Sequence, residues 1–493
     1  MDSRESYRSR SFISFVEIER DDTDNGGWVI FDSFSETVLE HYDHSPRGIR
    51  FQDKLFDHGL LTLRAPFGQV MKCKLEMGEL SEGWVRIVVN SQRNEEMIPA
   101  EVVMFGNSDE PPQVSIASIE ALSSEKLDFL NKESMLEREV RSHPSIIAGV
   151  LEMSLREVDP LELSVAVYDV GQGNCNAIVD RYEHPRIYFD LGWSPNFHAN
   201  SRPAKQPNFF ACEKKATPPV VLSHWDMDHW CHAIASSSYN PGSITTKHEW
   251  KNEALERFWI ARAPRSKEHK LGPLTLSFYY ALRRKKLLPG VSAVLLWPDV
   301  AKRIYFSAGW LEACSPPPGV PNDRNNSGIA MFVRPDPKDS AILLTGDADF
   351  PCIPSIAGRN KVPLCGLVAP HHGALITGRA VPSPQKGSPA RLVMSVGAGN
   401  SYGHPKQGAL NAYQKKGWLA SLTQDRFDCT RANTLHQHGN TLLKFCSSFK
   451  DPQCGCRCVE SGNLCLIPSA VAKIAPVAGA KKSKSAQKTK VTV

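Results

Sequence analysis

The chain contains no run of apolar residues long enough to cross a membrane. Hydrophobic residues make up 41% of the 493 residues, and no window approaches the roughly 18 consecutive apolar residues that a spanning helix needs. The first residues, MDSRESYRSRSF, also lack an apolar export segment, so we expect a cytoplasmic protein with no membrane partner. The 13 cysteines are then expected to be reduced thiols or metal ligands, not a disulfide framework.

Most of the chain also lacks a net charge. The formal net charge is +5, and the final stretch, KKSKSAQKTKVTV, carries five lysines by itself. The rest of the chain is therefore formally neutral, and any affinity for nucleic acid has to come from a local patch or from this tail. A solvated extension is the expectation for the tail, with nucleic-acid contact as the alternative.

The length predicts two or three domains. Short strand-like runs such as WVIFD and WVRIVV indicate a β-rich first domain, and SSEKLDFLNKESMLEREV has the apolar spacing of a helix. This helix is expected to be a connector, although it could equally belong to the core of the first domain. The predicted divisions are a β-rich accessory domain (1–115), a helical connector (116–160), a larger domain that carries most of the motifs (161–445), a Cys-rich segment (446–470) and a disordered basic tail (471–493).

The strongest chemical signal follows the apolar run PVVLS. The segment SHWDMDH places four metal-ligating side chains within six residues, and these are His224, Asp226, Asp228 and His229. A turn at the end of a strand can direct imidazoles and carboxylates toward a common point. Mixed nitrogen and oxygen donors suit zinc, manganese or iron. The alternative, a polar surface loop, would need four such residues to gather by chance.

Three further loops follow apolar runs and carry similar side chains. The run AILLTGD ends in Asp347, a carboxylate well placed to bridge two metals. The run LCGLVAP leads into His371 and His372, and SVGAGNSYGHP contains His404. Each loop alone is a modest signal, because Gly-Asp turns and surface histidine pairs are common. Their repeated placement after apolar strands is what predicts a metal site.

Seven motifs in this order resemble a known family. They are DVGQGN, FDLG, SHWDMDH, NNSGIAMFV, LLTGD, APHHG and SVGAGNSYGHP, and they span roughly residues 161–445. This stretch resembles the metallo-β-lactamase fold, specifically the hydrolase domain of the ComEC type of DNA-uptake protein. The resemblance implies an α/β fold, a four-layer αββα sandwich with a metal site at one edge of its two sheets, preceded here by the β-rich domain.

The resemblance also implies roles for individual residues. His224 and Asp226 would bind one metal, Asp228 and His229 the other, and Asp347 would bridge them. His371 and His404 are candidates to complete the two shells. Asp190 would support the metal loop from behind, whereas Asp169, Gln172 and Gly173 are expected to be structural.

Several positions depart from the family pattern. Asp226 stands where many members have a second histidine, as in the ComEC group, and Asn174 stands where Asp is usual. A mid-domain ligand histidine has no evident counterpart, and Asn325, Asn326 and Ser327 occupy its neighbourhood. The membrane channel that accompanies ComEC is missing, so DNA uptake is not inherited as a function.

A second candidate metal site lies near the carboxyl end. Cys454, Cys456, Cys458 and Cys465 could hold an additional structural zinc, although their C-x-C-x-C spacing is tighter than the common C-x-x-C knuckle. The alternative is an irregular loop of reduced thiols.

These observations predict a binuclear metallohydrolase with two divalent metal ions, Zn or Mn. We find neither a Gly-x-Ser-x-Gly elbow nor a P-loop, so water activated by the metals is the expected nucleophile. Asp228 would orient that water, and His372 or His404 would protonate the leaving group. The expected substrate is a nucleic acid or a nucleotide phosphodiester, and the first domain could bind a protein partner.

Two alternatives to a nuclease stay open. One is a hydrolase of a small substrate such as a cyclic nucleotide, and the other is a non-catalytic binding module. A prokaryotic defence or mobile-element system is one setting that suits the nuclease hypothesis. Salt dependence separates the first two possibilities, because binding of a polymeric nucleic acid weakens steeply with salt.

Overall fold

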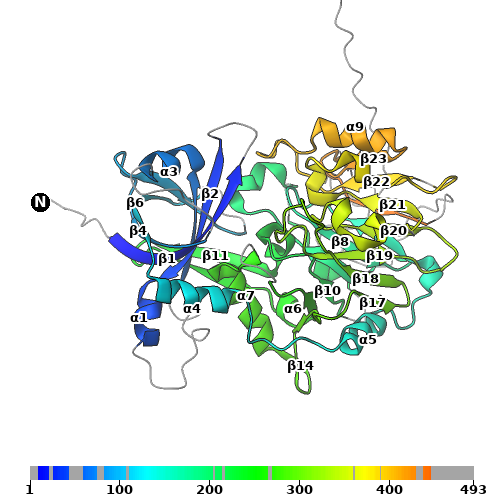
Figure 1. The fold of residues 1–493 in the computed structure, drawn as a ribbon, viewed down its shortest axis with the longest axis horizontal. Coiled ribbons are helices and arrows are strands. Elements are labelled where there is room, and N and C mark those ends of the chain that lie inside the picture. Colours follow the sequence, from blue (N-terminus) through cyan, green and yellow to red (C-terminus); the bar gives the residue numbers. More distant parts are fainter. Residues whose placement is uncertain are drawn as a thin grey trace, which may run out of the picture.

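The structure is a computed structural model. Within residues 9–445 it describes all but 21–25, 44–58, 75–82, 107–109, 204–205, 214–216, 265–268, 359–360, 389 and 429–436. Figure 1 shows the amino-terminal strands, coloured blue, beside a second part whose strands are coloured from cyan through green and yellow to orange. Among the described residues, no helix has both the length and the apolar character that crossing a bilayer requires.

The amino-terminal strands form a closed antiparallel barrel. Their order is β3-β2-β1-β4-β6-β5, and a further pairing between β3 and β5 closes the ring. Apolar side chains such as Phe12, Val29, Phe31 and Ile87 share one buried core. The strands are β1 (Ser9–Arg20), β2 (Gly27–Ser35), β3 (Leu60–Pro66), β4 (Gly83–Asn90), β5 (Ile98–Val102) and β6 (Gln113–Ala121), with α1 (Thr37–Asp43) and α3 (Phe67–Lys74) between them.

Two helices connect the barrel to the rest of the chain. The first, α4 (Ser124–Ser134), begins after Ser123, whose side chain accepts a hydrogen bond from the Lys126 backbone N–H. The second, α5 (Pro144–Ser154), packs against β17. A later hairpin, β11 (Ile234–Asn240) and β12 (Thr245–Trp250), extends the barrel sheet by pairing with β3. The domain boundaries proposed from the sequence stay predictions.

The larger part contains two seven-stranded mixed sheets. The first has the order β16-β13-β10-β9-β8-β7-β26, and the second runs from β17 to β23 in sequence order. The first sheet contains β7 (Ser164–Val167), β8 (Cys175–Val179), β9 (Pro185–Leu191), β10 (Val220–Val221), β13 (Trp259–Ala261), β16 (Val294–Leu296) and β26 (Thr441–Leu443). The second contains β17 (Arg303–Phe306), β18 (Gly309–Ala313), β19 (Ile329–Val333), β20 (Ala341–Leu344), β21 (Leu364–Val368), β22 (Arg391–Met394) and β23 (Leu419–Leu422).

The two sheets share one buried core. Ile178 and Phe189 from the first sheet belong to the same apolar cluster as Met331, Ile342 and Val368 from the second. The outer faces are buried too, which is why these strands are apolar on both sides.

Four further helices and two small hairpins lie around the sheets: α6 (Asn252–Leu255), α7 (Pro273–Arg284), α8 (Pro354–Ala357), α9 (Gln407–Lys415), β14 (Lys286–Leu288) with β15 (Val291–Ser292), and β24 (Phe427–Asp428) with β25 (Gln437–His438).

The prediction of an αββα sandwich was wrong. The structure is β-rich, contains a closed six-stranded antiparallel barrel, and does not show two helical layers enclosing the sheets. The outer face of the first sheet shares its apolar cluster with the barrel, through Phe15 and Trp84, as well as with α4 and α7. The other outer face is covered by the short α8 and α9 and by loops. The barrel thus covers part of a sheet face that the prediction assigned to helices.

Candidate metal centre

The candidate ligands lie in loops at the carboxyl ends of parallel strands. β9 and β10 are parallel neighbours in one sheet, and β20, β21 and β22 are parallel neighbours in the other. His224 follows β10, Asp347 follows β20, and His372 follows β21. Carboxyl ends of parallel strands meet at one edge, where ligands commonly bind. The two sheets therefore bring these three loops to one place.

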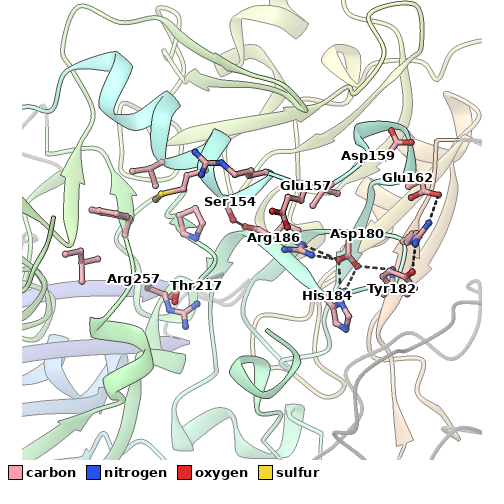
Figure 2. A pocket seen from close by; sticks show the side chains of 18 of the residues that line it. Ser154, Glu157, Asp159, Glu162, Asp180, Tyr182, His184, Arg186, Thr217 and Arg257 are labelled. Carbon is pink, nitrogen blue, oxygen red and sulfur yellow. Dashed lines mark hydrogen bonds and ion pairs between the residues drawn. The ribbon is translucent and has the colours of Figure 1, made fainter. Parts of the chain in front are cut away.

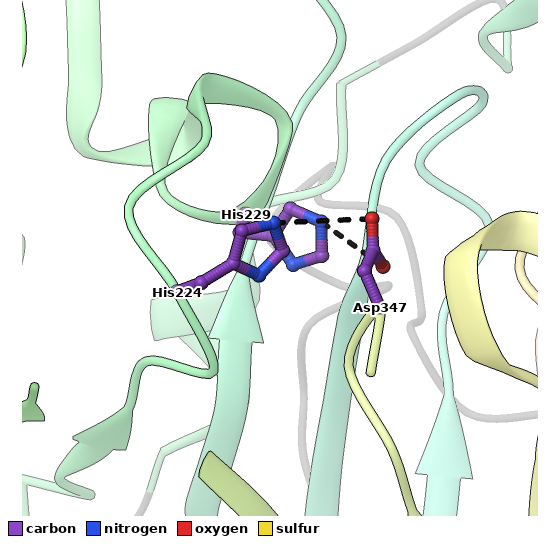
Figure 3. A group of neighbouring side chains, drawn as sticks. All are labelled: His224, His229 and Asp347. Carbon is purple, nitrogen blue, oxygen red and sulfur yellow. Dashed lines mark ion pairs between the residues drawn. The ribbon is translucent and has the colours of Figure 1, made fainter. Parts of the chain in front are cut away.

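Five side chains form two overlapping groups that could hold a metal. One group is His224, His229 and Asp347, and the other is Asp228, His229 and His372. Figure 3 shows the imidazoles of His224 and His229 directed toward the Asp347 carboxylate. The distance from His229 Nε2 to Asp347 Oδ1 is 3.4 Å, and from His224 Nε2 to Asp347 Oδ2 it is 3.9 Å. His372 Nε2 lies 3.0 Å from Asp228 Oδ2.

The chemistry of these side chains fits a divalent cation. Ligands bound at about 2.0–2.1 Å around a tetrahedral zinc lie roughly 3.3 Å from one another, close to the separations above. The Nε2 atoms of His224, His229 and His372 and Oδ1 of Asp347 are buried and have no hydrogen-bond partner among the described residues. Buried polar atoms are rarely left unpaired, and cations bound within the two groups would satisfy them.

Asp190 orients the metal loop from behind. Its carboxylate accepts hydrogen bonds from the Ser223 backbone N–H at 2.7 Å and from the Ser223 hydroxyl at 2.8 Å. It also lies 2.8 Å from His229 Nδ1, so this ring donates through Nδ1 and presents Nε2 to the other ligands. The Asn174 side-chain amide donates to the same carboxylate at 3.2 Å. An aspartate at position 174 would place a second negative charge there, which gives a physical reason for asparagine.

Backbone strain is concentrated at the same site. Asp190, His371 and His372 have φ values of 62°, 48° and 53°, in the left-handed region that non-glycine residues rarely adopt. Such conformations cost roughly 1–3 kcal/mol each and persist where surrounding contacts impose them. Here His372 Nδ1 donates to the Ser395 carbonyl at 2.8 Å, which holds the ring with Nε2 facing Asp228.

The buried charges shift one another's pKa values. Burial by itself would lower the pKa of His229, but the carboxylates of Asp347, Asp228 and Asp190 raise it well above its ordinary value. Burial would raise the pKa of Asp347, but the neighbouring histidines hold it well below its usual range. Asp347 is thus ionised, which is the form that binds a cation, whereas His229 has to release its proton before it can bind one.

Three predicted ligands lie outside the two groups. Asp226 Oδ2 is 3.3 Å from His224 Nε2, but Oδ1 forms an ion pair with Arg324 at 2.8 Å. The His371 side chain is 45% exposed, and its Nε2 is 3.9 Å from Asp347. His404 lines the same cleft, with its ring centre 5.7 Å from that of His371. His372, which was predicted to be catalytic, is the histidine of the loop after β21 that belongs to a candidate metal group.

The other predicted motif residues have structural contacts. Asp169 is buried and accepts hydrogen bonds from the Arg426 guanidinium and from the Gly439 backbone, which fixes the chain just before β26. Gln172 lines the cleft, and Gly173 packs against the Asp228 backbone. Asn326 accepts a hydrogen bond from the Asp349 backbone N–H at 3.1 Å.

The ligands open into a cleft of about 620 Å³ whose opposite wall comes from the barrel. Sequence reasoning missed the cleft residues Glu17, Glu19, His198, Arg324 and Tyr402. Glu17 and Glu19 lie in β1, far from every motif. Tyr402 stands within the SYGHP motif, and Arg324 directly precedes the NNSG motif, so these two had a usable signal in their neighbours.

A larger cavity, of about 1120 Å³, lies away from the candidate ligands. It is lined by the β8–β9 turn, where Asp180 contacts His184 and Arg186 (Figure 2). Burial would raise the pKa of Asp180, but hydrogen bonds from these two residues lower it to about 2. This cavity contains none of the residues predicted from the sequence.

The predicted zinc site at Cys454, Cys456, Cys458 and Cys465 and the lysine tail lie outside the described residues. Comparison with protein-family models and with curated proteins gives no match for this chain. The family resemblance therefore stays a prediction that rests on the motifs alone.

Proposed function

We propose that the chain is a divalent-metal-dependent hydrolase that cleaves phosphodiesters. The observation that carries this proposal is the convergence of buried ligand atoms from three loops: His224, His229, Asp347 and His372. Asp228 completes the second group. We propose two adjacent cation sites, with zinc or manganese as the candidates for a mixed nitrogen and oxygen ligand set. His229 could serve only one of them, because its Nδ1 donates to Asp190 and leaves Nε2 as its single ligand atom.

Each step of the reaction has a candidate side chain. A divalent cation bound here would supply Lewis-acid polarisation of a phosphoryl oxygen. Asp228, which is partly exposed in the cleft, would accept a proton from the attacking water and orient it. Water contributes the oxygen of the new P–O bond, the ester P–O bond breaks, and the leaving alkoxide takes up a proton. His372 stays the candidate donor of that proton if its Nε2 does not bind the cation.

The preference for phosphodiesters rests on the motif resemblance and on the oxygen-rich ligand set. A cytoplasmic location is also part of the proposal, and five buried cysteines, Cys175, Cys231, Cys314, Cys352 and Cys365, are free thiols, as expected in a reducing compartment. A binding module without catalysis is the rival, and it would bind metal and ligand in the same cleft without cleaving an ester.

The test combines metal content with turnover. The purified chain is analysed for bound metals, stripped, and reloaded with Mn²⁺, Zn²⁺ or Mg²⁺. Cleavage is then measured on bis(p-nitrophenyl) phosphate, on single- and double-stranded DNA, on RNA and on cyclic nucleotides. Asp228→Asn removes one charge and keeps the shape, and Asp128→Asn, an exposed position of α4, makes the same change away from the cleft.

We expect wild type and Asp128→Asn to bind metal and cleave at least one of these esters. Asp228→Asn should fold normally and lose turnover by about 100-fold or more, since a group that acts in the transition state is removed. Absence of cleavage with every metal, or equal rates for Asp228→Asn and wild type, would refute the proposal.

A further inference from the structure

The barrel contributes one wall of the candidate catalytic cleft. Glu17, Ile18 and Glu19, near the carboxyl end of β1, line the same 620 Å³ cavity as Asp228, Asp347 and His372. The metal ligands all come from the two-sheet part, so a ligand in the cleft would touch both parts of the chain. The barrel is therefore positioned to select what binds.

The size of the cleft favours a small substrate. Binding sites for small molecules typically measure about 300–1,000 Å³, and the cleft falls within this range. Grooves for single-stranded nucleic acid are positively charged along the backbone path. Here the lining contains six carboxylates, namely Glu17, Glu19, Asp226, Asp228, Asp323 and Asp347, against the two cations Arg324 and Lys406. Two divalent cations would neutralise the part near one phosphate and leave little attraction for a long polyanion.

Glu19 offers a hydrogen-bond acceptor away from the ligands. Its carboxylate interacts with the Tyr402 hydroxyl, but its Oε2 atom is buried without a hydrogen-bond partner among the described residues. The nearby Arg64 guanidinium packs over the Trp28 ring, 3.5 Å from its centre, and faces Phe197 at 4.4 Å. An unpaired buried oxygen is costly, and a donor group on a ligand would satisfy it.

Aromatic rings stand beside this acceptor. The rings of Phe197 and His198 lie 4.5 Å apart, and those of His198 and Tyr402 lie 5.2 Å apart. A planar ring with N–H donors could stack on these side chains and donate to Glu19, as nucleobases do in sites built from aromatic and acidic residues.

From this juxtaposition we infer that the substrate is a nucleotide-sized phosphodiester, whose base donates hydrogen bonds to Glu19 while its phosphate faces Asp228 and Asp347. This inference rests on the proposed function and adds a substrate class to it. Glu19 is the specificity-determining residue, and it reaches the site only because the barrel packs against the two sheets.

The experiment compares substrates with and without a base. Cyclic mononucleotides and dinucleotides carry N–H donors, whereas bis(p-nitrophenyl) phosphate is aromatic and has none. Both classes, and single-stranded DNA, are assayed with the full metal-loaded chain at about 50 and 200 mM salt. The variants are Glu19→Gln and Glu19→Ala, with Glu95→Gln as the control, an exposed glutamate of the barrel.

For wild type we expect faster cleavage of at least one nucleotide than of DNA, with little dependence on salt. Glu19→Ala should lower the ratio of nucleotide to bis(p-nitrophenyl) phosphate kcat/KM by about 10- to 100-fold, the effect of leaving one buried donor of the base without its acceptor. The loss should appear mainly in KM. Glu19→Gln, which keeps one acceptor oxygen, should retain part of that ratio, and Glu95→Gln should retain all of it.

Three results would overturn the inference. One is an equal loss on both substrate classes in Glu19→Ala, which would make Glu19 merely structural. Another is a preference for DNA that falls steeply with salt, which would indicate a polymer substrate. The third is cleavage of bis(p-nitrophenyl) phosphate without any cleavage of a nucleotide. Failure to cleave any ester with any metal would instead refute the proposed function itself.

Discussion

Glu17 of the barrel forms an ion pair of 2.5 Å with Arg324 of the two-sheet part. The same guanidinium contacts Asp226 Oδ1 at 2.8 Å, and the other oxygen of Asp226 lies 3.3 Å from His224 Nε2. A chain of contacts thus runs from β1 of the barrel to a candidate metal ligand. Burial would raise the pKa of Asp226, but Arg324 and His224 lower it, so the carboxylate at the end of this chain is ionised.

Glu17→Gln should loosen Asp226 without unfolding the protein. The side chains of Glu17 and Arg324 are partly exposed, so the loss of stability should stay below about 1 kcal/mol. Removing a partner that orients a ligand typically lowers metal affinity by about 10- to 100-fold. Glu17 reaches Asp226 only through Arg324, so we expect a loss at or below the lower end of this range, about 10-fold or less, when Zn²⁺ or Mn²⁺ is titrated by calorimetry, and no change in Glu95→Gln. Equal affinities in the two variants would show that the ion pair does not position the site.

Gly192→Ala should disrupt the metal loop through its backbone. A Cβ atom at this position would lie 1.8 Å from the Asp228 carbonyl oxygen and 2.6 Å from that of Asn174. Both are backbone atoms, so the loop itself has to move. We expect a loss of stability of roughly 2–4 kcal/mol, as for severe overpacking, together with weakened metal binding. Denaturant unfolding and metal titration measure the two effects.

Gly149→Ala is the matched control for that substitution. Gly149 lies inside α5, and nothing lies within 4 Å of a Cβ atom built there. Alanine is the better helix former by about 0.5–1 kcal/mol, so this variant should be as stable as wild type or slightly more stable. If Gly149→Ala lost as much stability as Gly192→Ala, close packing at Gly192 would not be the cause.

The sequence predicts individual strands better than their assembly. Runs such as GIAMFV and AILL are apolar throughout, and they form β19 and β20, buried on both faces. The first strand, β1, was not predicted, because SRSFISFVEIER mixes charged and apolar residues. Closure of the barrel joins β3 to β5, and that long-range pairing has no local signal. The αββα prediction failed for the same reason, since packing between distant segments decides what covers a sheet.

The candidate site, too, was predictable from the sequence only in part. Histidines and aspartates directly after apolar strands could be identified from sequence, and the structure brings His224, Asp228, His229 and Asp347 together. The choice between His371 and His372 depends on two consecutive left-handed backbone conformations, which the motif does not encode. Glu17 and Glu19 reach the cleft through packing of the barrel, so no local pattern could mark them.

Asp32 should make stability depend on pH. It is buried in β2, and its carboxylate accepts a hydrogen bond from the Leu274 backbone N–H at 2.9 Å, at the start of α7. Burial raises the pKa of Asp32 from 3.8 to about 8, although hydrogen bonds from Leu274 and Thr62 oppose the shift. Between about pH 4 and pH 8 the folded chain keeps a proton that the unfolded chain releases. The free energy of unfolding should therefore fall as the pH rises through this window.

Asp32→Asn isolates that contribution. The amide oxygen can still accept from Leu274, but the side chain no longer titrates. The difference in unfolding free energy between the variant and wild type should grow in favour of the variant from pH 5 to pH 8, by at most about 1.4 kcal/mol per pH unit. Denaturant titrations at several pH values measure it. A constant difference across this range would mean that Asp32 titrates at its ordinary pKa in the folded chain.

The two neighbouring histidines of the loop after β21 should differ in their effect on metal binding. His372 is buried, with Nε2 3.0 Å from Asp228 and Nδ1 fixed by the Ser395 carbonyl. The side chain of His371 is nearly half exposed and belongs to neither metal group. Loss of an outer hydrogen-bond partner of a ligand typically lowers metal affinity by about 10- to 100-fold. His372→Ala should therefore weaken binding of at least one cation by more than this, whereas His371→Ala should stay within this range.

Because both residues have positive φ, the two alanine variants carry similar backbone strain, and each is a control for the other. Elemental analysis and the absorption spectrum of the Co²⁺-loaded chain report binding without reference to turnover. A larger loss in His371→Ala would restore His371 as the ligand and leave His372 to catalysis.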